Sequence, residues 1–323
     1  MPQPPLYAIE GFGPPAGAQT VEVRSADGLS LRTAFFPAPN ARGSVVLNNG
    51  RTEFIEKYYE VIGELVARGF SVVTHDWRGQ GLSSRLLADR LKGYAVDAPP
   101  FLDDLDLILE TYGARLPRPW IVVGHSMGGA LTLLHLLQRP GAFDAAVLSS
   151  PMTGVNLQRN IPIVVRLLIL VRWLFGRLGD YVTAPKAPPW DDHFNPDNTV
   201  TNDEARFTRT VDLLKAHHDL ALNGATWGWL NFALNAARAI QSSPAAATLQ
   251  IPLRIVAAGD ERLADTAATQ AFCARVPKGQ CVVAPGAKHE ILMETDATRA
   301  LFWASFDEAA AGLSNSQPRT SAA

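Results

Sequence analysis

A serine with glycines on both sides is the first feature of this sequence that could do chemistry. Ser126 is the third residue of Gly-His-Ser-Met-Gly (124–128), which lies between the apolar run WIVV and an apolar segment with helical spacing. A side chain at Gly124 or Gly128 would collide with the chain in a sharp strand-to-helix turn, so the two glycines fit such a turn. The hydroxyl would project at a helix N-terminus, where the dipole and free N–H groups favour negative charge. The pattern indicates a nucleophilic serine.

A histidine and two acidic residues near the C-terminus could complete the chemistry of Ser126. A serine hydroxyl needs a base to take its proton, and the base needs a carboxylate to orient it. His289 follows the apolar run QCVVA and is the only histidine after His218, while Asp260 and Glu261 follow the earlier run IPLRIVAA. The chain order serine, acid, histidine is typical of serine hydrolases with this kind of turn. We therefore expect His289 to be the base and one of the two neighbouring carboxylates to be the acid.

Two backbone N–H groups are also needed, because an attacked carbonyl oxygen becomes negatively charged. One donor is the residue after the nucleophile, Met127, and the other belongs to a loop after an early strand. Residues 48–53 (NNGRTE) follow the apolar run SVVL and place a flexible glycine directly before Arg51. We expect the N–H groups of Met127 and Arg51 to bind the oxyanion, and an ordinary strand–helix turn is the alternative for 48–53.

The elements that must position these residues follow from the hydrophobic pattern. Short apolar runs alternate with longer helical patterns from Thr20 to Ser149 and again from Ile251, with a hairpin signal at Asp27-Gly28. This rhythm predicts an α/β fold in which helices flank a mostly parallel sheet. The expected parts are a core (20–150 and 244–312), a helical cap or lid insertion (151–243) and flexible termini (1–19 and 313–323).

Composition excludes several kinds of protein. A chain of 323 residues with 47% hydrophobic side chains can bury a large core, and a net charge of −2 lacks the basic surface of a general nucleic-acid binder. Cys273 and Cys281 are too few for a disulfide framework, so we expect two reduced thiols. His217-His218-Asp219 lacks metal-ligand spacing, so neither a metal nor another cofactor is expected.

The most apolar stretch, residues 161–175, is shorter than the roughly 20 residues that a membrane span needs, and Arg166 and Arg172 interrupt it. The N-terminus also lacks a charged region followed by an apolar one, so we expect a soluble, cytoplasmic protein. A helix continuing to Arg177 would place Arg159, Arg166 and Arg177 on one face. Such a helix could line an acyl site or rest on the inner membrane surface, or it could pack on the core with its arginines outward.

Five short motifs are spread over the chain: NGRTEFIEKY (49–58), DWRGQGLS (76–83), GHSMGG (124–129), NGATWGWL (223–230) and HEILME (289–294). Together they resemble the lysophospholipase and monoacylglycerol-lipase branch of the α/β-hydrolase superfamily, and the bacterial lysophospholipase L2 type in particular. The resemblance spans roughly residues 20–310 and implies an α/β-hydrolase fold with a helical cap and ester-hydrolysing activity. Two positions depart from the family: relatives often carry His at Asn49, and aligning on Arg262 puts Glu261 where Asp is common, with Asp260 as the alternative acid.

The sequence therefore predicts a cofactor-free serine hydrolase that cleaves carboxylic esters of lipid-like substrates, lysophospholipids or monoacylglycerols first. In this hypothesis His289 takes the proton of Ser126, which attacks the ester carbonyl. A peptidase of the proline-iminopeptidase type shares the fold and would need an acidic cluster in the cap, for which Asp191-Asp192 and Asp203-Glu204 are candidates. A catalytically silent binding protein is the third alternative, which the complete serine, acid and histidine set disfavours.

Overall fold

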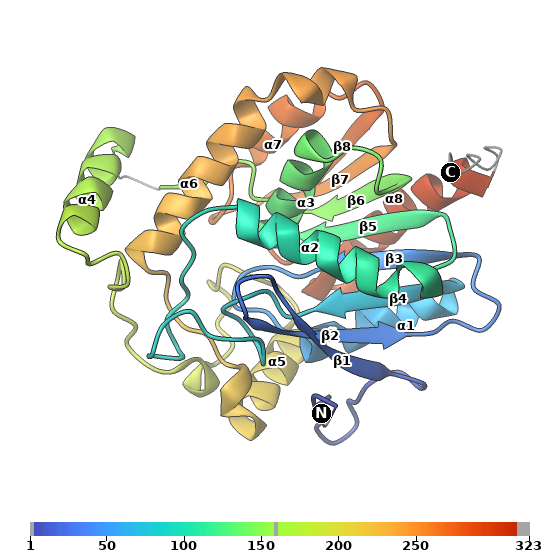
Figure 1. Ribbon diagram of the computed structural model, residues 1–323, viewed down its shortest axis with the longest axis horizontal. Helices are drawn as coiled ribbons and strands as arrows, with labels where there is room; N and C mark the ends of the chain where they lie inside the picture. The colour runs from blue at the N-terminus through green and yellow to red at the C-terminus, as the bar shows by residue number, and fades with distance from the viewer. Residues whose placement is uncertain (1–2, 158–160, 315–323) are drawn as a thin grey trace.

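A central sheet of eight strands organises the computed structural model, which describes residues 3–157 and 161–314 (Figure 1). The strands are β1 (Gln19–Arg24), β2 (Ser30–Phe36), β3 (Gly43–Asn48), β4 (Phe70–His75), β5 (Trp120–His125), β6 (Ala145–Ser149), β7 (Leu253–Ala258) and β8 (Gly279–Ala284). Their spatial order is β1-β2-β4-β3-β5-β6-β7-β8. Among these strands, the two pairs that include β2 are antiparallel and the other five are parallel, so the predicted mostly parallel sheet is confirmed.

Helices cover both faces of the sheet and create two hydrophobic cores. The core helices are α1 (Tyr59–Ala67), α2 (Pro99–Tyr112), α3 (Ser126–Gln138), α7 (Thr266–Cys273) and α8 (Asp296–Ser314). Side chains of α2, α3 and α7 pack on one face, and those of α1 and α8 pack on the other. Successive strand residues alternate between the faces: on β5, Val122 joins the first core, and Ile121 and Val123 join the second. Burial on both sides explains why the parallel strands read as continuous apolar runs.

The predicted N-terminal hairpin is present as the antiparallel pair β1–β2, and Gly28 in its turn has φ +83°. A positive φ is readily adopted only by glycine, which accounts for the residue at this position. The segment before β1 contacts the insertion: the Tyr7 hydroxyl donates a hydrogen bond to Asp219 (2.7 Å), and the Tyr7 ring stacks on His217 at 3.9 Å. Flexibility of the termini stays a prediction, and residues 315–323 lie outside the described residues.

Three longer helices lie between β6 and β7: α4 (Pro162–Leu174), α5 (Glu204–Ala216) and α6 (Trp227–Ser242). The Asp203 side chain caps α5 by accepting from Arg206 N, and the Thr226 side chain caps α6 by accepting from Trp229 N. Helix α6 lies against α3, whereas α4 projects away from the rest of the molecule (Figure 1). Within the described ranges, no helix is both long and apolar enough to cross a membrane. The division of the chain into core and cap stays a prediction.

Helix α4 is shorter than the expected helix over 161–177. It ends at Leu174, and the chain turns at Gly176, whose φ is +65°. Arg177 therefore lies beyond the helix, and Arg159 lies outside the described residues. The expected arginine face is wrong for the part of the chain that the structure describes, because the helix stops before it can carry Arg177.

Candidate active site

Ser126 occupies a strained turn between β5 and α3. Its φ is +51°, a left-handed conformation that costs free energy for a residue with a side chain and is often found at functional sites. Two residues later, a Cβ on Gly128 would lie 2.3 Å from the carbonyl oxygens of both Asn48 and Asn49. The glycine therefore lets the loop after β3 approach the first turn of α3. This close approach brings the two segments that were expected to supply N–H donors beside each other.

The side chains of Ser126, His289 and Glu261 form a continuous hydrogen-bonded line. His289 lies in the loop after β8, and its Nε2 is 2.8 Å from Ser126 Oγ. Glu261 lies in the loop after β7, and its Oε2 is 2.7 Å from His289 Nδ1. These loops lie at the carboxyl ends of neighbouring parallel strands, which meet at one edge of the sheet. The fold thus assembles three residues that are far apart in the sequence.

Asp260 does not take part in this line. Its carboxylate pairs with the Arg262 guanidinium at 3.1 Å. The other carboxylate oxygen of Glu261 accepts hydrogen bonds from the N–H groups of Leu263 (2.8 Å) and Ala264 (3.0 Å). Glu261 is thereby fixed in its orientation toward His289, whereas Asp260 is turned toward solvent with its arginine.

The hydrogen bonds also define how the protons are arranged. An ionised carboxylate can only accept, so His289 Nδ1 donates to Glu261 and leaves Nε2 free to accept from the Ser126 hydroxyl. Burial alone would raise the pKa of Glu261, but the hydrogen bond from His289, with the two backbone donors, holds it below its usual range. A neutral imidazole held this way can remove a proton from a hydroxyl.

Among the other histidines, His125 lies beside this line, with its ring centre 4.9 Å from that of His289. His135 Nε2 is 2.7 Å from Asp106, His217 stacks on Tyr7, and His218 stacks on Trp190 at 4.0 Å. His75 and His125 are buried, and His193 is exposed. None of them is hydrogen-bonded to Ser126 in the described part of the chain, so His289 has no rival there as the partner of this hydroxyl.

The loop that carries Arg51 is held by a buried carboxylate. Glu53 accepts hydrogen bonds from Gly50 N and from the Tyr58 hydroxyl (2.6 Å). Burial would raise the pKa of Glu53, but Lys57 and its other partners lower it to about 2. Glu53 therefore stays ionised and fixes the turn that precedes Arg51. The N–H of Met127 belongs to the first turn of α3, where helix geometry leaves such groups without intrahelical partners.

One group among the described residues has the composition of a metal site. The ligand atoms of Glu53, His125 and Glu290 lie within 4.8 Å of one another. The Lys57 ammonium, however, lies 2.9 Å from Glu53 and 2.8 Å from Glu290. Burial would lower the pKa of Lys57, but the two carboxylates raise it above its usual range, so the lysine is charged. The protein's own cation neutralises these carboxylates, and the group does not fit a divalent ion as well.

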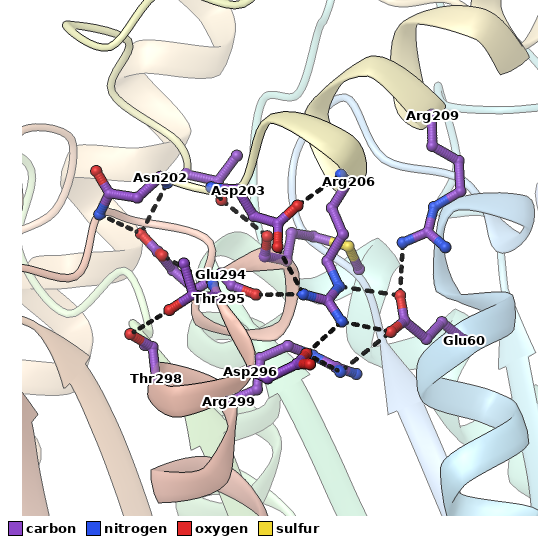
Figure 2. A network of polar contacts seen from close by, with 12 residues as sticks. Glu60, Asn202, Asp203, Arg206, Arg209, Glu294, Thr295, Asp296, Thr298 and Arg299 are labelled. Carbon is purple, nitrogen blue, oxygen red and sulfur yellow. Dashed lines mark hydrogen bonds and ion pairs between the residues drawn. The ribbon is translucent and has the colours of Figure 1, made fainter.

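The loop of His289 is anchored to the insertion. The N–H of Glu290 donates to the carbonyl of Val200 (2.8 Å), and the buried carboxylate of Glu294 accepts from the N–H groups of Lys288 and Asn202, both at 3.0 Å. Figure 2 shows how Arg206 of α5 closes this arrangement by donating to the carbonyl of Glu294 (2.9 Å). The segment before α5 and the His289 loop therefore form one hydrogen-bonded unit.

Arg206 also links α5 to the core. Its guanidinium lies 2.6 Å from carboxylate oxygens of both Glu60 on α1 and Asp296 at the start of α8. Arg209, one turn further along α5, reaches Glu60 at 2.5 Å, and Arg299 of α8 reaches it at 3.1 Å (Figure 2). The Arg206 network, defined by these five residues, ties α5 to the core beside the His289 loop.

Helix α4 presents a large apolar surface. The sequence alone left open whether this helix packs on the core or contacts lipid. Within the helix only Val165 and Ile169 are buried, mainly against Trp227 and its neighbours. Exposed large apolar side chains run along and beyond it: Ile161, Ile163, Val164, Leu167, Leu168, Leu170, Val171, Trp173, Leu174 and Phe175. Exposed apolar side chains in such number are unusual on a monomeric protein and are often found at interaction sites.

Comparison with known proteins identifies similar chains. A family model described as Serine aminopeptidase, S33 (Hydrolase_4) matches residues 39–296. Lysophospholipase L2 of Escherichia coli (strain K12) is 30% identical over 290 residues, covering 87% of this chain and 84% of the relative. Monoacylglycerol lipase of Mycolicibacterium smegmatis is 28% identical over 264 residues, covering 80% of this chain and 85% of the relative.

A solved structure has the same fold. It is a soluble variant of monoglyceride lipase from Saccharomyces cerevisiae in complex with a substrate analog. The match covers 96% of this chain and 98% of the other, with a TM-score of 0.72 and 19% sequence identity. At that identity the match shows the fold, and the α/β-hydrolase architecture implied by the five motifs is confirmed.

Proposed function

This chain belongs to the α/β-hydrolase family described as serine aminopeptidase, S33, and on that premise we propose that it hydrolyses carboxylic esters of lipid-like substrates. Lysophospholipids and monoacylglycerols are the first candidates, because relatives that align over most of the chain are named lysophospholipase L2 and monoacylglycerol lipase. The observation that carries the proposal is the hydrogen-bonded line from Glu261 through His289 to Ser126.

The proposed reaction proceeds through an acyl-enzyme. His289 Nε2 takes the hydroxyl proton while Ser126 Oγ attacks the ester carbonyl, and Glu261 stabilises the imidazolium that forms. The N–H groups of Met127 and Arg51 bind the negatively charged oxygen. The C–O bond to the alcohol then breaks, and the departing alcohol receives the proton from His289. A water molecule, deprotonated by His289, attacks the acyl carbon and releases the carboxylic acid and free Ser126.

A hydrolysis panel tests the proposal. We expect the highest kcat/KM on lysophospholipids and monoacylglycerols, lower values on short p-nitrophenyl esters and little activity on amino-acid anilides. Ser126→Ala is the matched control, which separates enzymatic turnover from spontaneous hydrolysis. Preference for the anilides, or equal rates with and without the Ser126 hydroxyl, would contradict the proposal.

We further propose that α4 contacts a lipid surface or the acyl chain of the substrate. The exposed apolar side chains of the helix support this contact, and Arg166 on the same helix would attract anionic lipid, whereas Arg172 is paired with Asp180 at 3.2 Å. Pro162, the first residue of α4, lines the same cavity as Glu261, so a lipid contact at this end of the helix would bring substrate near the proposed site.

The family description keeps an aminopeptidase as the second candidate. Such an enzyme needs free carboxylates to bind an amino terminus, and Asp203 does not offer one, because it caps α5 and pairs with Arg206 at 2.8 Å. Asp191, Asp192 and Glu204 are exposed residues of the insertion and stay candidates for this binding. The anilide arm of the panel distinguishes the two activities.

A further inference from the structure

Arg51 is a half-buried arginine without a carboxylate partner in the described chain, a property that it shares with Arg85. Three arginines buried in the described chain each lie close to at least one carboxylate: Arg32, Arg78 and Arg299. The Arg51 guanidinium instead donates from Nη2 to the carbonyl of Asn223, and its Nε is buried without a hydrogen-bond partner among the described residues. Burial lowers the pKa of Arg51 to about 10, which leaves it charged at neutral pH. A buried cation without a counter-charge is costly, so an anion would stabilise it.

The guanidinium lies beside the proposed active site. Its Cζ is 4.9 Å from the centre of the Trp229 ring, and Trp229 Nε1 is 3.5 Å from the sulfur of Met127, the residue after Ser126. A Cβ on Gly93 would lie 3.1 Å from Arg51 Nη2, and Gly93, Met127 and Trp229 line one small cavity. The Arg51 guanidinium is therefore linked through the Trp229 ring to Met127, the residue next to the nucleophile.

From these contacts we infer that Arg51 binds the phosphodiester of a lysophospholipid head group, an inference that rests on the proposed ester hydrolysis. The Arg51 N–H is the proposed oxyanion donor, so one residue would contact the reacting carbonyl and the head group. In arginine, a fixed number of bonds separates the backbone nitrogen from Cζ. The same number separates the carbonyl carbon from the phosphorus in a lysophospholipid that is acylated at the end of its glycerol. Guanidinium forms strong, directional hydrogen bonds with phosphate oxygens.

A neutral monoacylglycerol would not supply this charge. It can place its carbonyl at Ser126, but it leaves the Arg51 guanidinium buried without an anion. The carboxylate of a fatty-acid product would form at Ser126 itself, where the two N–H groups are expected, and not at the far end of the Arg51 side chain. The chemistry of the Arg51 side chain therefore favours substrates with an anionic head group.

The test compares a lysophospholipid with a monoacylglycerol that carries the same acyl chain. The measured quantity is the ratio of their kcat/KM values for the wild type, Arg51→Met and Arg51→Lys. Both variants keep the backbone N–H, so the ratio isolates the head group from any effect on the oxyanion loop. We expect the ratio to fall by roughly 10- to 100-fold in Arg51→Met, mainly through KM for the lysophospholipid, because hydrogen bonds to charged groups are of that strength. Arg51→Lys should lie between, since lysine keeps the charge and loses the planar fork.

Arg85→Met is the control. Arg85 also lacks a carboxylate partner, and its Nε is likewise unpartnered among the described residues. Its two Nη atoms donate to the carbonyl oxygens of Gly79, Asp219 and Ala221, so it fixes loops and the ratio should not change. Should Arg51→Met fail to fold by circular dichroism, Arg51→Lys alone decides. An unchanged ratio with both esters still cleaved would overturn the inference and leave the proposed function intact. If Arg51→Met relieves inhibition by the fatty-acid product but leaves the ratio unchanged, the anion that Arg51 binds is the product carboxylate. That result would also overturn the inference. If the wild type cleaves neither ester, the proposed function fails and this inference fails with it.

Discussion

Glu261 Oε2 lies 2.7 Å from His289 Nδ1, while the neighbouring Asp260 carboxylate lies 3.1 Å from the Arg262 guanidinium. Two adjacent acids of one loop therefore face different partners. The N–H groups of Leu263 and Ala264 hold the Glu261 carboxylate in place from its other side. This division of contacts makes the two acids separable by mutation.

Glu261→Gln should impair catalysis severely, because an amide cannot orient His289 in the same tautomer or stabilise its charged form. The loss in kcat should be on the order of 10³- to 10⁴-fold, the scale seen when a serine protease loses its orienting acid. Asp260→Asn, the matched control, should stay within a few-fold of the wild type because its partner is Arg262. Steady-state kinetics on one ester, with circular dichroism of each variant, measure the effect. The reverse pattern would assign the acid to Asp260.

Ser126 should be the site of covalent labelling by an organophosphonate. The hydroxyl lies 2.8 Å from His289 Nε2 in a turn with φ +51°, so it is the serine best placed to attack a phosphorus centre. One adduct on Ser126 is expected by mass spectrometry of digested protein, and Ser126→Ala should lose roughly 10³-fold or more in kcat. Ser149 and Ser150 are the nearby controls, and an adduct on either would contradict the role of Ser126.

The buried His75 should make the fold less stable as pH falls. Burial lowers the pKa of His75 to about 3, and neither ring nitrogen has a hydrogen-bond partner in the described chain. The unfolded chain, with a histidine pKa near 6.5, therefore binds the extra proton between about pH 6.5 and pH 3. The contribution of neutral His75 to the free energy of unfolding is complete above the histidine pKa of the unfolded chain. It is lost as pH falls through this window.

His75→Leu removes that proton uptake, so its free energy of unfolding should depend less steeply on pH. Relative to the wild type, the variant should gain about 2 kcal/mol between about pH 7 and pH 5. Urea unfolding at several pH values measures this difference. His193→Leu, at an exposed position, is the control and should follow the wild type. Parallel pH profiles for wild type and His75→Leu would refute the prediction.

Local sequence patterns were sufficient for much of the fold. Apolar runs and turn residues predicted the hairpin, the parallel strands and the core helices, because burial on both sheet faces and glycine at a positive φ are local requirements. Ser126 and His289 could be singled out for a similar reason, since one stands in a Gly-x-Ser-x-Gly turn and the other alone in a late loop. Their catalytic roles stay predictions.

Partners that are distant in the sequence could not be read in the same way. The choice between Asp260 and Glu261 depends on side-chain directions within one loop, and the neutralisation of Glu53 and Glu290 by Lys57 depends on three separate elements meeting. The exposure of α4 was also undecidable, because a continuous apolar run has the same composition whether it packs on a core or faces solvent. These features arise from tertiary contacts and not from propensity.

Arg206 should matter more for stability and catalysis than its neighbour Arg209. Arg206→Met removes the contacts with Glu60, Asp203, Asp296 and the Glu294 carbonyl, and leaves the partly buried Asp203 carboxylate without a guanidinium partner. A loss of about 1–3 kcal/mol in unfolding free energy is expected, less than for a fully buried pair because solvent screens several partners. Since the same residues hold the His289 loop, kcat should fall as well.

Arg209→Met is the matched control for the Arg206 network. It removes one contact, with Glu60, and a cation–π contact with Phe12. Both variants can be compared by urea unfolding and by kcat on a short ester. Equal losses would indicate that the network acts only through the charge on Glu60, and a normal kcat in Arg206→Met would show that it does not position His289.

Helix α4 should bind lipid through its exposed leucines. Leu167, Leu168 and Leu170 are 55%, 44% and 48% exposed, so replacing all three by Asp removes little packing and should leave the unfolding free energy within about 1 kcal/mol of the wild type. The same change places three negative charges where apolar side chains would enter lipid, and burying one leucine contributes about 1.5–3 kcal/mol. Co-sedimentation with anionic phospholipid vesicles should therefore fall at least tenfold, and KM for long-chain esters should rise while KM for a short soluble ester changes less.

Leu263→Asp is the control, because Leu263 is a 42% exposed apolar residue outside α4 and should leave vesicle binding unchanged. Unchanged vesicle binding together with equal losses on long and short esters would mean that α4 serves the fold and not the lipid.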